Sequence, residues 1–262
     1  MEDIDAVIHL AAISNDPSSE LDPQLTREVN YEAVKTLAQL AREKGVKRFI
    51  NPSSAAVYGI QKEANVTEDL PPAPLTFYAE QKARSEAYLL EMNADDFTVV
   101  SVRPATLCGY APRQRLDLIV NILTHHAIHK GEIIVYGGEQ IRPNLHIQDM
   151  VDAYCMLLRA DSGKIGGEVF NLGSENHSVL DLAHITKEVL GTDACIQIVP
   201  TLDPRSYHIS SQKIQQLLGF TPQYGVVDAV RDLQQAFQQN LIPHSFHPRY
   251  YNVLYMRRKR II

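Results

Sequence analysis

The chain has 262 residues, 45% hydrophobic and 21% charged, which is enough to bury the core of one large α/β domain or of two closely joined ones. Its formal net charge of −6 argues against a nucleic-acid surface, which is usually basic. The 3 cysteines are too few for a disulfide framework, and neither a signal peptide nor a run of ~20 apolar residues occurs. We therefore expect a soluble, cytoplasmic protein that contacts neither nucleic acid nor membrane.

The first hundred residues alternate between apolar runs bounded by turn residues and longer stretches with helical periodicity. Alternation of strand and helix at these lengths indicates βαβ units around a parallel sheet, so we predict a doubly wound, Rossmann-type α/β fold. The pattern predicts, in chain order, a strand at 6–10, a helix at 25–44, a strand at 46–52, a helix at 77–92 and a strand at 97–104.

Beyond residue 106 the rhythm loosens, and we predict a smaller α/β lobe over 107–262 that covers the carboxyl ends of the first sheet, where ligands of such sheets bind. Residues 149–174 are able to fold back onto the first domain, 1–106, so the sequence does not fix the boundary between the two domains. Asp149 is well placed to cap a following helix, and Ser178 with Asp181 resembles a capping box.

Two stretches carry residues suited to proton transfer, "SSAAVYG" at 53–59 and "YAEQK" at 78–82. The first follows a strand, while Tyr78 and Lys82 stand one turn apart on a helix. A tyrosine has an ordinary pKa of about 10, and a neighbouring ammonium favours its phenolate. A nearby serine hydroxyl can orient the substrate oxygen. A tyrosine four residues before a lysine also occurs by chance, as an aromatic anchor beside a solvated lysine. The prediction therefore depends on the combination of this pair with the strand and the "SSAAVYG" turn that precede it.

In order and spacing, these stretches resemble the extended short-chain dehydrogenase/reductases, in particular the NAD-dependent nucleotide-sugar epimerases and dehydratases of the UDP-glucose 4-epimerase kind. The likeness includes "DAVIHLAA", "YAEQKARSEAYLL", "SVRPATLCGYAP", "IRPNLHIQDMVDAY" and "RSYHISSQKIQQLLGF", and runs from Asp5 to about Gln223. It implies transient oxidation of a sugar hydroxyl, with Tyr78 as catalytic base and acid. Lys82 would hold the nicotinamide ribose and lower the Tyr pKa, and Ser54 would orient the substrate.

The resemblance also implies a set of binding residues. Arginines suit the nucleotide diphosphate because a guanidinium grips phosphate oxygens bidentately. Matched to cofactor-binding positions are Leu10, Ala11, Ala12, Ile13, Ser14, Asn30, Tyr78, Lys82 and Ala105, and matched to substrate-binding positions are Ser54, Thr106, Asn121, Arg142 and Arg205.

The family's glycine-rich turn, G-x-x-G-x-x-G, does not occur in this sequence, nor does the acidic ribose-binding residue that follows it. By this resemblance the chain starts at the family's fourth strand, so we expect an N-terminally truncated Rossmann sheet. NAD is the implied cofactor, and we expect this chain to bind it weakly. The alternative is an inactive remnant that only binds a nucleotide sugar or a protein partner.

Departures at the active site narrow the implied chemistry. The 4,6-dehydratases have an Asp–Glu pair where Ala55 and Ala56 stand, and decarboxylating relatives have a Glu in this turn. Without a general acid there, epimerase-like or plain ketose-reducing chemistry is favoured. Thr106 stands where the family often has Asn, which alters one diphosphate or sugar contact.

Three further features have mostly ordinary explanations. His125 and His129 have the i, i+4 spacing of a zinc pair but lack an accompanying glutamate or cysteine, so we predict no metal site. The basic end, 255–262, is predicted to be a solvated tail. Helices 25–44 and 76–93 match those through which relatives dimerise, although their apolar stripes fit ordinary core packing equally well.

Overall fold

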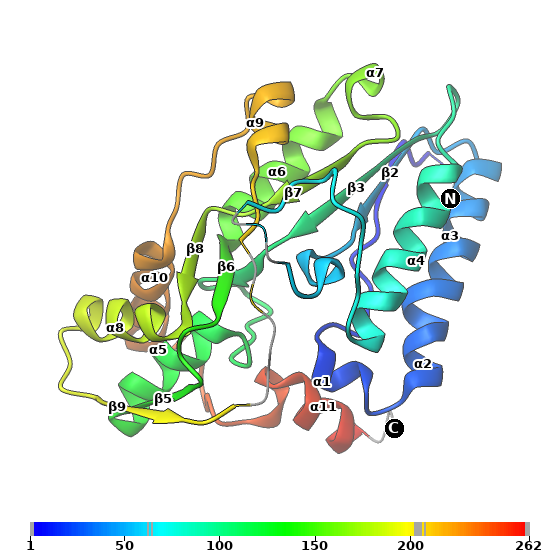
Figure 1. Ribbon diagram of the computed structural model, residues 1–262. Helices are drawn as coiled ribbons and strands as arrows, with labels where there is room; N and C mark the ends of the chain where they lie inside the picture. The colour runs from blue at the N-terminus through cyan, green and yellow to red at the C-terminus, as the bar shows by residue number, and fades with distance from the viewer. Residues whose placement is uncertain (1–2, 62, 64, 202–205, 207, 260–262) are drawn as a thin grey trace.

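The computed structural model describes residues 3–61, 63, 65–201, 206 and 208–259 (Figure 1). Its first sheet is entirely parallel, with the strand order β1-β2-β3-β7. The last of these strands comes from the region 149–174, so the chain returns to the first sheet after building other structure. The strands are β1 (Ala6–Ile8), β2 (Arg48–Pro52), β3 (Thr98–Pro104) and β7 (Val169–Leu172).

Helices cover both faces of this sheet. Phe49 of β2 packs with α3 (Ala33–Glu43) and α4 (Phe77–Glu91), whereas its neighbour Ile50 packs with α6 (Ile147–Arg159). Successive side chains of a strand point to opposite faces, so alternate apolar residues serve the two helical layers. The predicted α/β architecture with a parallel, Rossmann-like sheet is confirmed.

The long helix predicted at 25–44 begins slightly earlier than expected. It starts with α2 (Pro23–Arg27), where the Asp22 Oδ1 accepts a hydrogen bond of 2.9 Å from the Leu25 backbone nitrogen. A π-helical turn over Glu28–Glu32 then leads into α3. Gly45, with a φ of +78°, follows the helix in the left-handed region that glycine adopts readily.

The second lobe holds two small sheets and three helices that pack together through apolar side chains. One sheet has the order β4-β6-β8, in which β4 and β6 are parallel and β6 and β8 antiparallel, and the other pairs β5 with β9 in parallel. These elements are β4 (Thr106–Cys108), β5 (Glu132–Tyr136), β6 (Ile141–His146), β8 (Glu175–Ser178), β9 (Cys195–Val199), α5 (Ile119–Lys130), α8 (Val179–Leu190) and α10 (Val226–Gln238).

Among the described residues, the chain also forms four shorter α-helices and the 3₁₀ helix Pro248–Tyr250. In the part of the chain that the structure describes, no helix has the length and apolar character needed to cross a bilayer. The short helices are α1 (Asp16–Ser19), α7 (Ser162–Ile165), α9 (Gln212–Leu218) and α11 (Asn252–Lys259).

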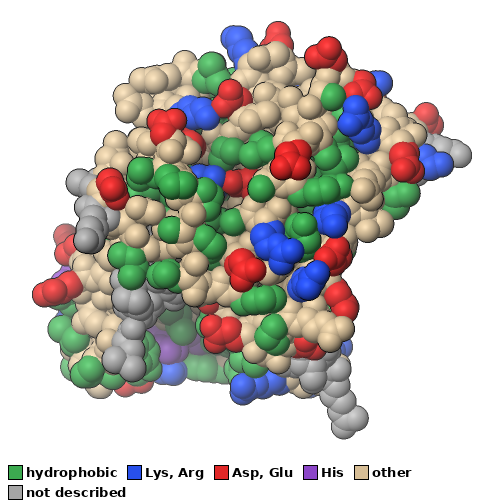
Figure 2. Space-filling model, turned by 45° about the vertical axis from the view of Figure 1, so that its right-hand side comes forward, with side chains coloured by type: hydrophobic (Ala, Val, Ile, Leu, Met, Phe, Trp, Pro, Cys, Tyr) green, Lys and Arg blue, Asp and Glu red, His purple; other side chains and the backbone are tan. Residues whose placement is uncertain are grey.

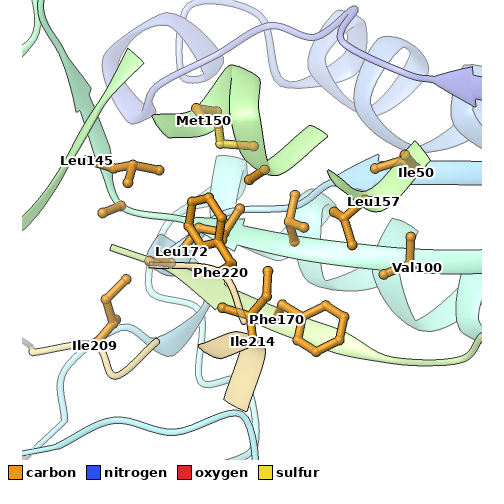
Figure 3. Close-up of a cluster of buried hydrophobic side chains, with 14 of the residues drawn as sticks. Ile50, Val100, Leu145, Met150, Leu157, Phe170, Leu172, Ile209, Ile214 and Phe220 are labelled. Atoms are coloured by element: carbon orange, nitrogen blue, oxygen red, sulfur yellow. The ribbon is translucent and has the colours of Figure 1, made fainter. Parts of the chain in front are cut away.

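The largest apolar cluster joins the two lobes (Figure 3). Ile50 and Val100 reach it from the first sheet, and Leu145 from the β6 strand of the second lobe. Ile209 and Phe220 close it from the C-terminal part of the chain. Because all five are at most 5% exposed, both lobes depend on the same buried surface.

A buried polar network ties the helix α4 to the sheet. Arg103 on β3 lies 2.6 Å from the Glu86 carboxylate of α4 and donates a 2.7 Å hydrogen bond to the Tyr58 hydroxyl. Tyr58 in turn donates to the Asn171 Oδ1 on β7, at 2.8 Å. Since Glu86 lies one turn beyond Lys82, the network fixes the helix face that carries Lys82.

The structure corrects one predicted cap and confirms another. The α6 helix begins at Ile147 with His146 as its N-cap, so Asp149 already lies in the first turn. The Asp149 carboxylate instead accepts hydrogen bonds from the backbone nitrogens of Gln223 and Tyr224, at 2.8 and 3.1 Å. The capping box of Ser178 is present, with both reciprocal hydrogen bonds to its partner three residues later.

The basic C-terminal stretch is also not wholly a solvated tail. Residues up to 259 form α11, and Met256 on this helix is buried. The charged residues of its last turn stay exposed, as the sequence suggested. The prediction was wrong about Met256 because a short basic helix can bury one apolar face while its cations remain in water.

The outer face of α3 and α4 carries aromatic rings and cations. Arg84 lies 4.4 Å from the centre of the Tyr31 ring, and Lys35 lies 5.4 Å from the centre of the Tyr88 ring. Figure 2 shows apolar side chains interspersed with Lys and Arg on the side of the molecule that includes these helices. A homodimer through this face stays a prediction.

Candidate active site

A cavity of about 500 Å³ lies at the carboxyl ends of the first three strands, where the first sheet meets the second lobe. It collects residues from the loop after β1, the turn after β2, the first turns of α4, and the segments around β4 and β6. The predicted site residues that line it are Leu10, Ala12, Ser14, Ser54, Tyr78, Lys82, Ala105, Thr106 and Arg142.

The serine turn is built by local hydrogen bonding. The Ser54 side chain accepts a 3.2 Å hydrogen bond from the Ala56 backbone nitrogen and so caps a short 3₁₀ helix, Ala55–Tyr58. Gly59 ends this turn with a φ of +65°, and a Cβ there would lie 2.1 Å from the Ala73 carbonyl oxygen. Only glycine fits so close a backbone approach, so the "VYG" sequence holds Ser54 at the cavity wall.

Ser53 is the second hydroxyl of this turn. It lines the same cavity, is 3% exposed, and its Oγ has no hydrogen-bond partner among the described residues. A buried hydroxyl without a partner is costly unless a ligand or water satisfies it. The resemblance favoured Ser54 over Ser53, and the structure leaves Ser53 as an additional polar atom for a bound molecule.

Lys82 is held in the cavity wall by α4. Thr76 caps the helix through a 3.2 Å hydrogen bond to its side chain from the Ala79 backbone nitrogen. One turn later Lys82 is 7% exposed, and its Nζ donates to the Pro52 carbonyl oxygen at 2.8 Å. Burial lowers the pKa of Lys82 to about 8, because the charged form is poorly solvated there.

Tyr78 shares the cavity with a second tyrosine, Tyr154 of α6. Burial raises the pKa of Tyr154 above its ordinary value, and the negative charge that Tyr78 carries when ionised raises it further. Tyr154 therefore remains a neutral phenol, and Tyr78 lies one helical turn from Lys82 on α4.

Two arginines, Arg115 and Arg142, line the cavity. Arg142 donates a 3.2 Å hydrogen bond to the Ile141 carbonyl oxygen. Arg115 uses its Nε on the Asp117 carboxylate, at 2.9 Å, and its Nη1 on the Ser14 hydroxyl, at 3.2 Å. The Arg115 Nη2 is buried and has no partner among the described residues. Such a donor suits an anionic oxygen of a ligand.

Four predicted residues do not line the cavity. Ala11 and Ile13 belong to the loop after β1 but face elsewhere, whereas Asn30 and Asn121 are buried and engage backbone groups. Asn121 accepts from the Gly109 nitrogen at 3.1 Å and donates to the Arg115 carbonyl oxygen at 2.9 Å. Arg205 lies outside the described residues.

Asn30 binds the backbone of the loop after β1. Its Oδ1 accepts from the Ile13 nitrogen and its Nδ2 donates to the Ile13 carbonyl oxygen, both at 2.8 Å. It sits in the π-helical turn, in the middle of the helical segment rather than at its start. Its place in the structure therefore supports a positioning contact to the loop, and a direct cofactor contact remains a prediction.

We expect Asn30→Ala to destabilise the protein by about 1–3 kcal/mol, because it leaves two partly buried backbone groups of Ile13 without partners. Chemical denaturation measures this change. Gln39→Ala, on the exposed side of the same helical segment, is the matched control and should change the free energy of unfolding by less than about 0.5 kcal/mol. Equal effects of the two substitutions would contradict the assigned role.

Several residues that line the cavity are absent from the set predicted from the sequence. Met150 and Tyr154 lie one turn apart on α6, so helical periodicity was a signal that could have placed them on one face. Arg115 and Asp117 lie in an irregular segment without periodicity, and the only signal was the "RQRLD" charge pattern itself.

The histidines of α5 pack into an aromatic cluster. His125 is fully buried, and its Nε2 lies 2.8 Å from the Ser245 Oγ. Its ring lies 4.6 Å from that of Phe246, and burial lowers its pKa to about 3. Within the described ranges, no group of three or more His, Cys, Asp or Glu side chains is arranged to hold a metal ion.

Comparison with known proteins places the site in context. Residues 1–173 match the family model described as "NAD dependent epimerase/dehydratase family". UDP-glucose 4-epimerase of Lactobacillus helveticus is 30% identical, with 95% of this chain and 80% of the relative covered. UDP-glucose 4-epimerase of Lacticaseibacillus casei is 27% identical, with 91% of this chain and 78% of the relative covered.

Solved structures with the same fold agree with these matches. MoeE5 in complex with UDP-glucuronic acid and NAD superposes with a TM-score of 0.82 at 26% identity, covering 91% of this chain and 81% of MoeE5. UDP-glucuronic acid 4-epimerase from Bacillus cereus, in complex with UDP-glucuronic acid and NAD, gives a TM-score of 0.81 at 27% identity. That comparison covers 91% of this chain and 76% of the epimerase.

Proposed function

Because this chain belongs to the NAD-dependent epimerase/dehydratase family, we propose that it acts as a 4-epimerase on a UDP-linked sugar, with NAD as its cofactor. The observation that carries the proposal is that Ser54, Tyr78 and Lys82 line one cavity together with two arginines. Three groups suited to alcohol–ketone chemistry thus lie beside guanidinium groups suited to a diphosphate. The 4-epimerases among the relatives support the same reading.

The residues present fit the nicotinamide end of NAD. Lys82 and Tyr78 line the cavity beside the loop after β1, of which Leu10 and Ala12 contribute to this part of the wall. The small side chain of Ala12 leaves room for a planar ring, and the Ser53 hydroxyl, which has no partner among the described residues, offers a hydrogen bond. When bound, NAD would accept a hydride from the sugar carbon and later return it.

The side chains of this chain supply the proton chemistry. Tyr78, as phenolate, takes the proton from the sugar hydroxyl while the Lys82 ammonium stabilises the negative oxygen. Ser54 orients the same sugar oxygen through its hydroxyl. After the keto-sugar presents its other face, Tyr78 returns the proton to the oxygen. Each role requires only groups that line the cavity.

The turn at the cavity wall supports epimerisation over dehydration. Expelling water from a sugar needs a general acid, and relatives that dehydrate carry an acidic pair directly after the Ser or Thr. Here Ala55 is buried in the core and Ala56 lines the cavity, so neither supplies a carboxyl group. Of the two acidic residues that line the cavity, Asp117 is engaged by Arg115 and Asp16 accepts a hydrogen bond from the Thr76 hydroxyl.

The diphosphate assignment is tested with Arg142→Ala. We expect the Kd for UDP to rise by about 10-fold to 150-fold, because a hydrogen bond to a charged group contributes about 1.5–3 kcal/mol. Isothermal titration calorimetry with UDP measures the Kd, and a coupled assay of UDP-galactose conversion measures turnover. We expect the turnover number at saturating substrate to fall far less than the affinity.

Arg159→Ala on α6 is the matched control, since this arginine lies outside the cavity and should leave the UDP affinity unchanged. A chain that binds UDP but does not interconvert the 4-epimers would contradict the epimerase assignment. A chain that binds neither UDP nor NAD would contradict the proposed function as a whole.

A further inference from the structure

The C-terminal helix α11 reaches the rim of the cavity and contacts residues that line it. Figure 1 shows α11 beside α1, although α1 comes from the N-terminal part of the chain. The Asn252 backbone nitrogen donates to the Asp117 Oδ2 at 2.9 Å. Its side-chain Nδ2 donates to both oxygens of Ser14, to the carbonyl at 3.2 Å and to the hydroxyl at 3.1 Å. One residue of α11 therefore joins two walls of the cavity.

Arg115 closes these contacts into a ring. Its Nε binds the second oxygen of Asp117 at 2.9 Å, and its Nη1 donates to the Ser14 hydroxyl at 3.2 Å. Ser14, Arg115 and Asp117 all line the cavity, whereas Asn252 stands behind them. Each of the four residues contacts at least two of the others. The orientation of Ser14 and Arg115 in the cavity wall therefore depends on Asn252, which does not line the cavity.

The ring leaves two donors available to a ligand. The Ser14 hydroxyl accepts hydrogen bonds from both Asn252 and Arg115, so its own hydrogen is left to donate. The Arg115 Nη2 is buried without a partner among the described residues. Donors fixed in advance cost little ordering entropy when a ligand binds, which is the advantage of a preorganised site.

We propose that Asn252 is a positioning residue that holds Ser14 and Arg115 in the orientation in which they bind the anionic nucleotide sugar. This inference rests on the proposed function. It makes the C-terminal helix part of the substrate site, although no residue of α11 lines the cavity. The recognised chemistry is that of a nucleoside diphosphate with oxygen acceptors directed at the two donors.

The test uses the full chain and the variant Asn252→Leu, which removes the Nδ2 donor at nearly constant size and keeps the backbone contact to Asp117. We expect the Kd for UDP, measured by calorimetry, to rise about tenfold. Leu254→Ala, on the exposed side of the same helix, is the matched control and should leave the Kd unchanged.

A double-mutant cycle separates positioning from general stability. Ser14→Ala removes the hydroxyl on which Asn252 acts, so the double variant should bind UDP no more weakly than the weaker of the two single variants. The inference would be overturned if the two increases in the Kd for UDP multiplied in the double variant. It would also be overturned if Asn252→Leu bound UDP with wild-type affinity. Failure of the proposed function is distinguishable, because the wild-type chain itself would then not bind UDP, and the inference would fall with it.

Discussion

Replacing Tyr78 by Phe is expected to lower the turnover of the proposed 4-epimerase reaction by about 10²-fold to 10⁴-fold, the usual effect of removing a positioned proton-transfer group. Phe keeps the ring that lines the cavity and removes only the hydroxyl that takes and returns the proton. The affinity for UDP should therefore stay nearly unchanged. Steady-state kinetics with UDP-galactose, together with calorimetry, measure the two quantities separately.

The matched control makes the same substitution on the same helix. Tyr88 of α4 faces outward, where its hydroxyl accepts a 2.8 Å hydrogen bond from Gln39. Tyr88→Phe should leave turnover unchanged, because its hydroxyl is remote from the cavity lining. A Tyr78→Phe variant that retains wild-type turnover would show that another group moves the proton, and Tyr154 would be the next residue to test.

Lys82→Met is expected to abolish most turnover and, at neutral pH, to make the protein more stable. The fall of the Lys82 pKa from 10.5 to about 8 corresponds to a destabilisation of roughly 3 kcal/mol at neutral pH. Methionine fills a similar volume without a charge. The Pro52 carbonyl loses its donor, which costs about 1 kcal/mol, so we expect a net gain of about 2 kcal/mol.

The pH dependence of the wild-type chain should show that protonated Lys82 supports turnover but lowers the free energy of unfolding. Below about pH 8, Lys82 is protonated in both the folded and the unfolded chain, and the burial penalty is fully present. Between about pH 8 and 10.5 the unfolded chain binds more protons, so the contribution of Lys82 to the free energy of unfolding rises with pH. Turnover should fall over this range, because the ammonium beside Tyr78 is lost.

Lys35→Met on α3 provides the comparison, since Lys35 is partly exposed and lies 3.4 Å from the Glu32 carboxylate. It should change the free energy of unfolding by no more than about 1 kcal/mol. Urea denaturation of the wild type, Lys82→Met and Lys35→Met at two pH values measures the three free energies of unfolding. If Lys82→Met proves less stable than the wild type at neutral pH, the surroundings stabilise the protonated lysine and the burial penalty assigned to it is wrong.

Short-range patterns in the sequence predicted the first sheet well. The apolar-rich runs at 6–10, 46–52 and 97–104 contain the strands β1, β2 and β3. The inner strands β2 and β3 are mostly buried, as apolar residues at successive positions indicate, whereas β1 lies at the sheet edge and is only half-buried. The capping box of Ser178 was equally visible, since its partner lies three residues away. The lining of the cavity by Ser54, Tyr78 and Lys82 follows from their places at strand and helix ends.

Contacts between distant segments were not predictable in this way. Asp149 carries the composition of a cap, yet it binds the backbone of residues 223 and 224, which only the folded second lobe brings near. Asn252 and Ser14 are 238 residues apart, and neither lies in a distinctive pattern. A sequence reports local propensity and periodicity, whereas such partners depend on how the lobes pack.

The position of β7 beside β3 has a consequence for synthesis on the ribosome. Ser101 pairs with Val169, so the first sheet stays one strand short until the intervening second-lobe segment has been translated. At about 5–20 residues per second, the 65 residues from Pro104 to Val169 take roughly 3–13 s. During that interval the β3 edge of the nascent chain is open, and it is there that we expect a chaperone to be needed most.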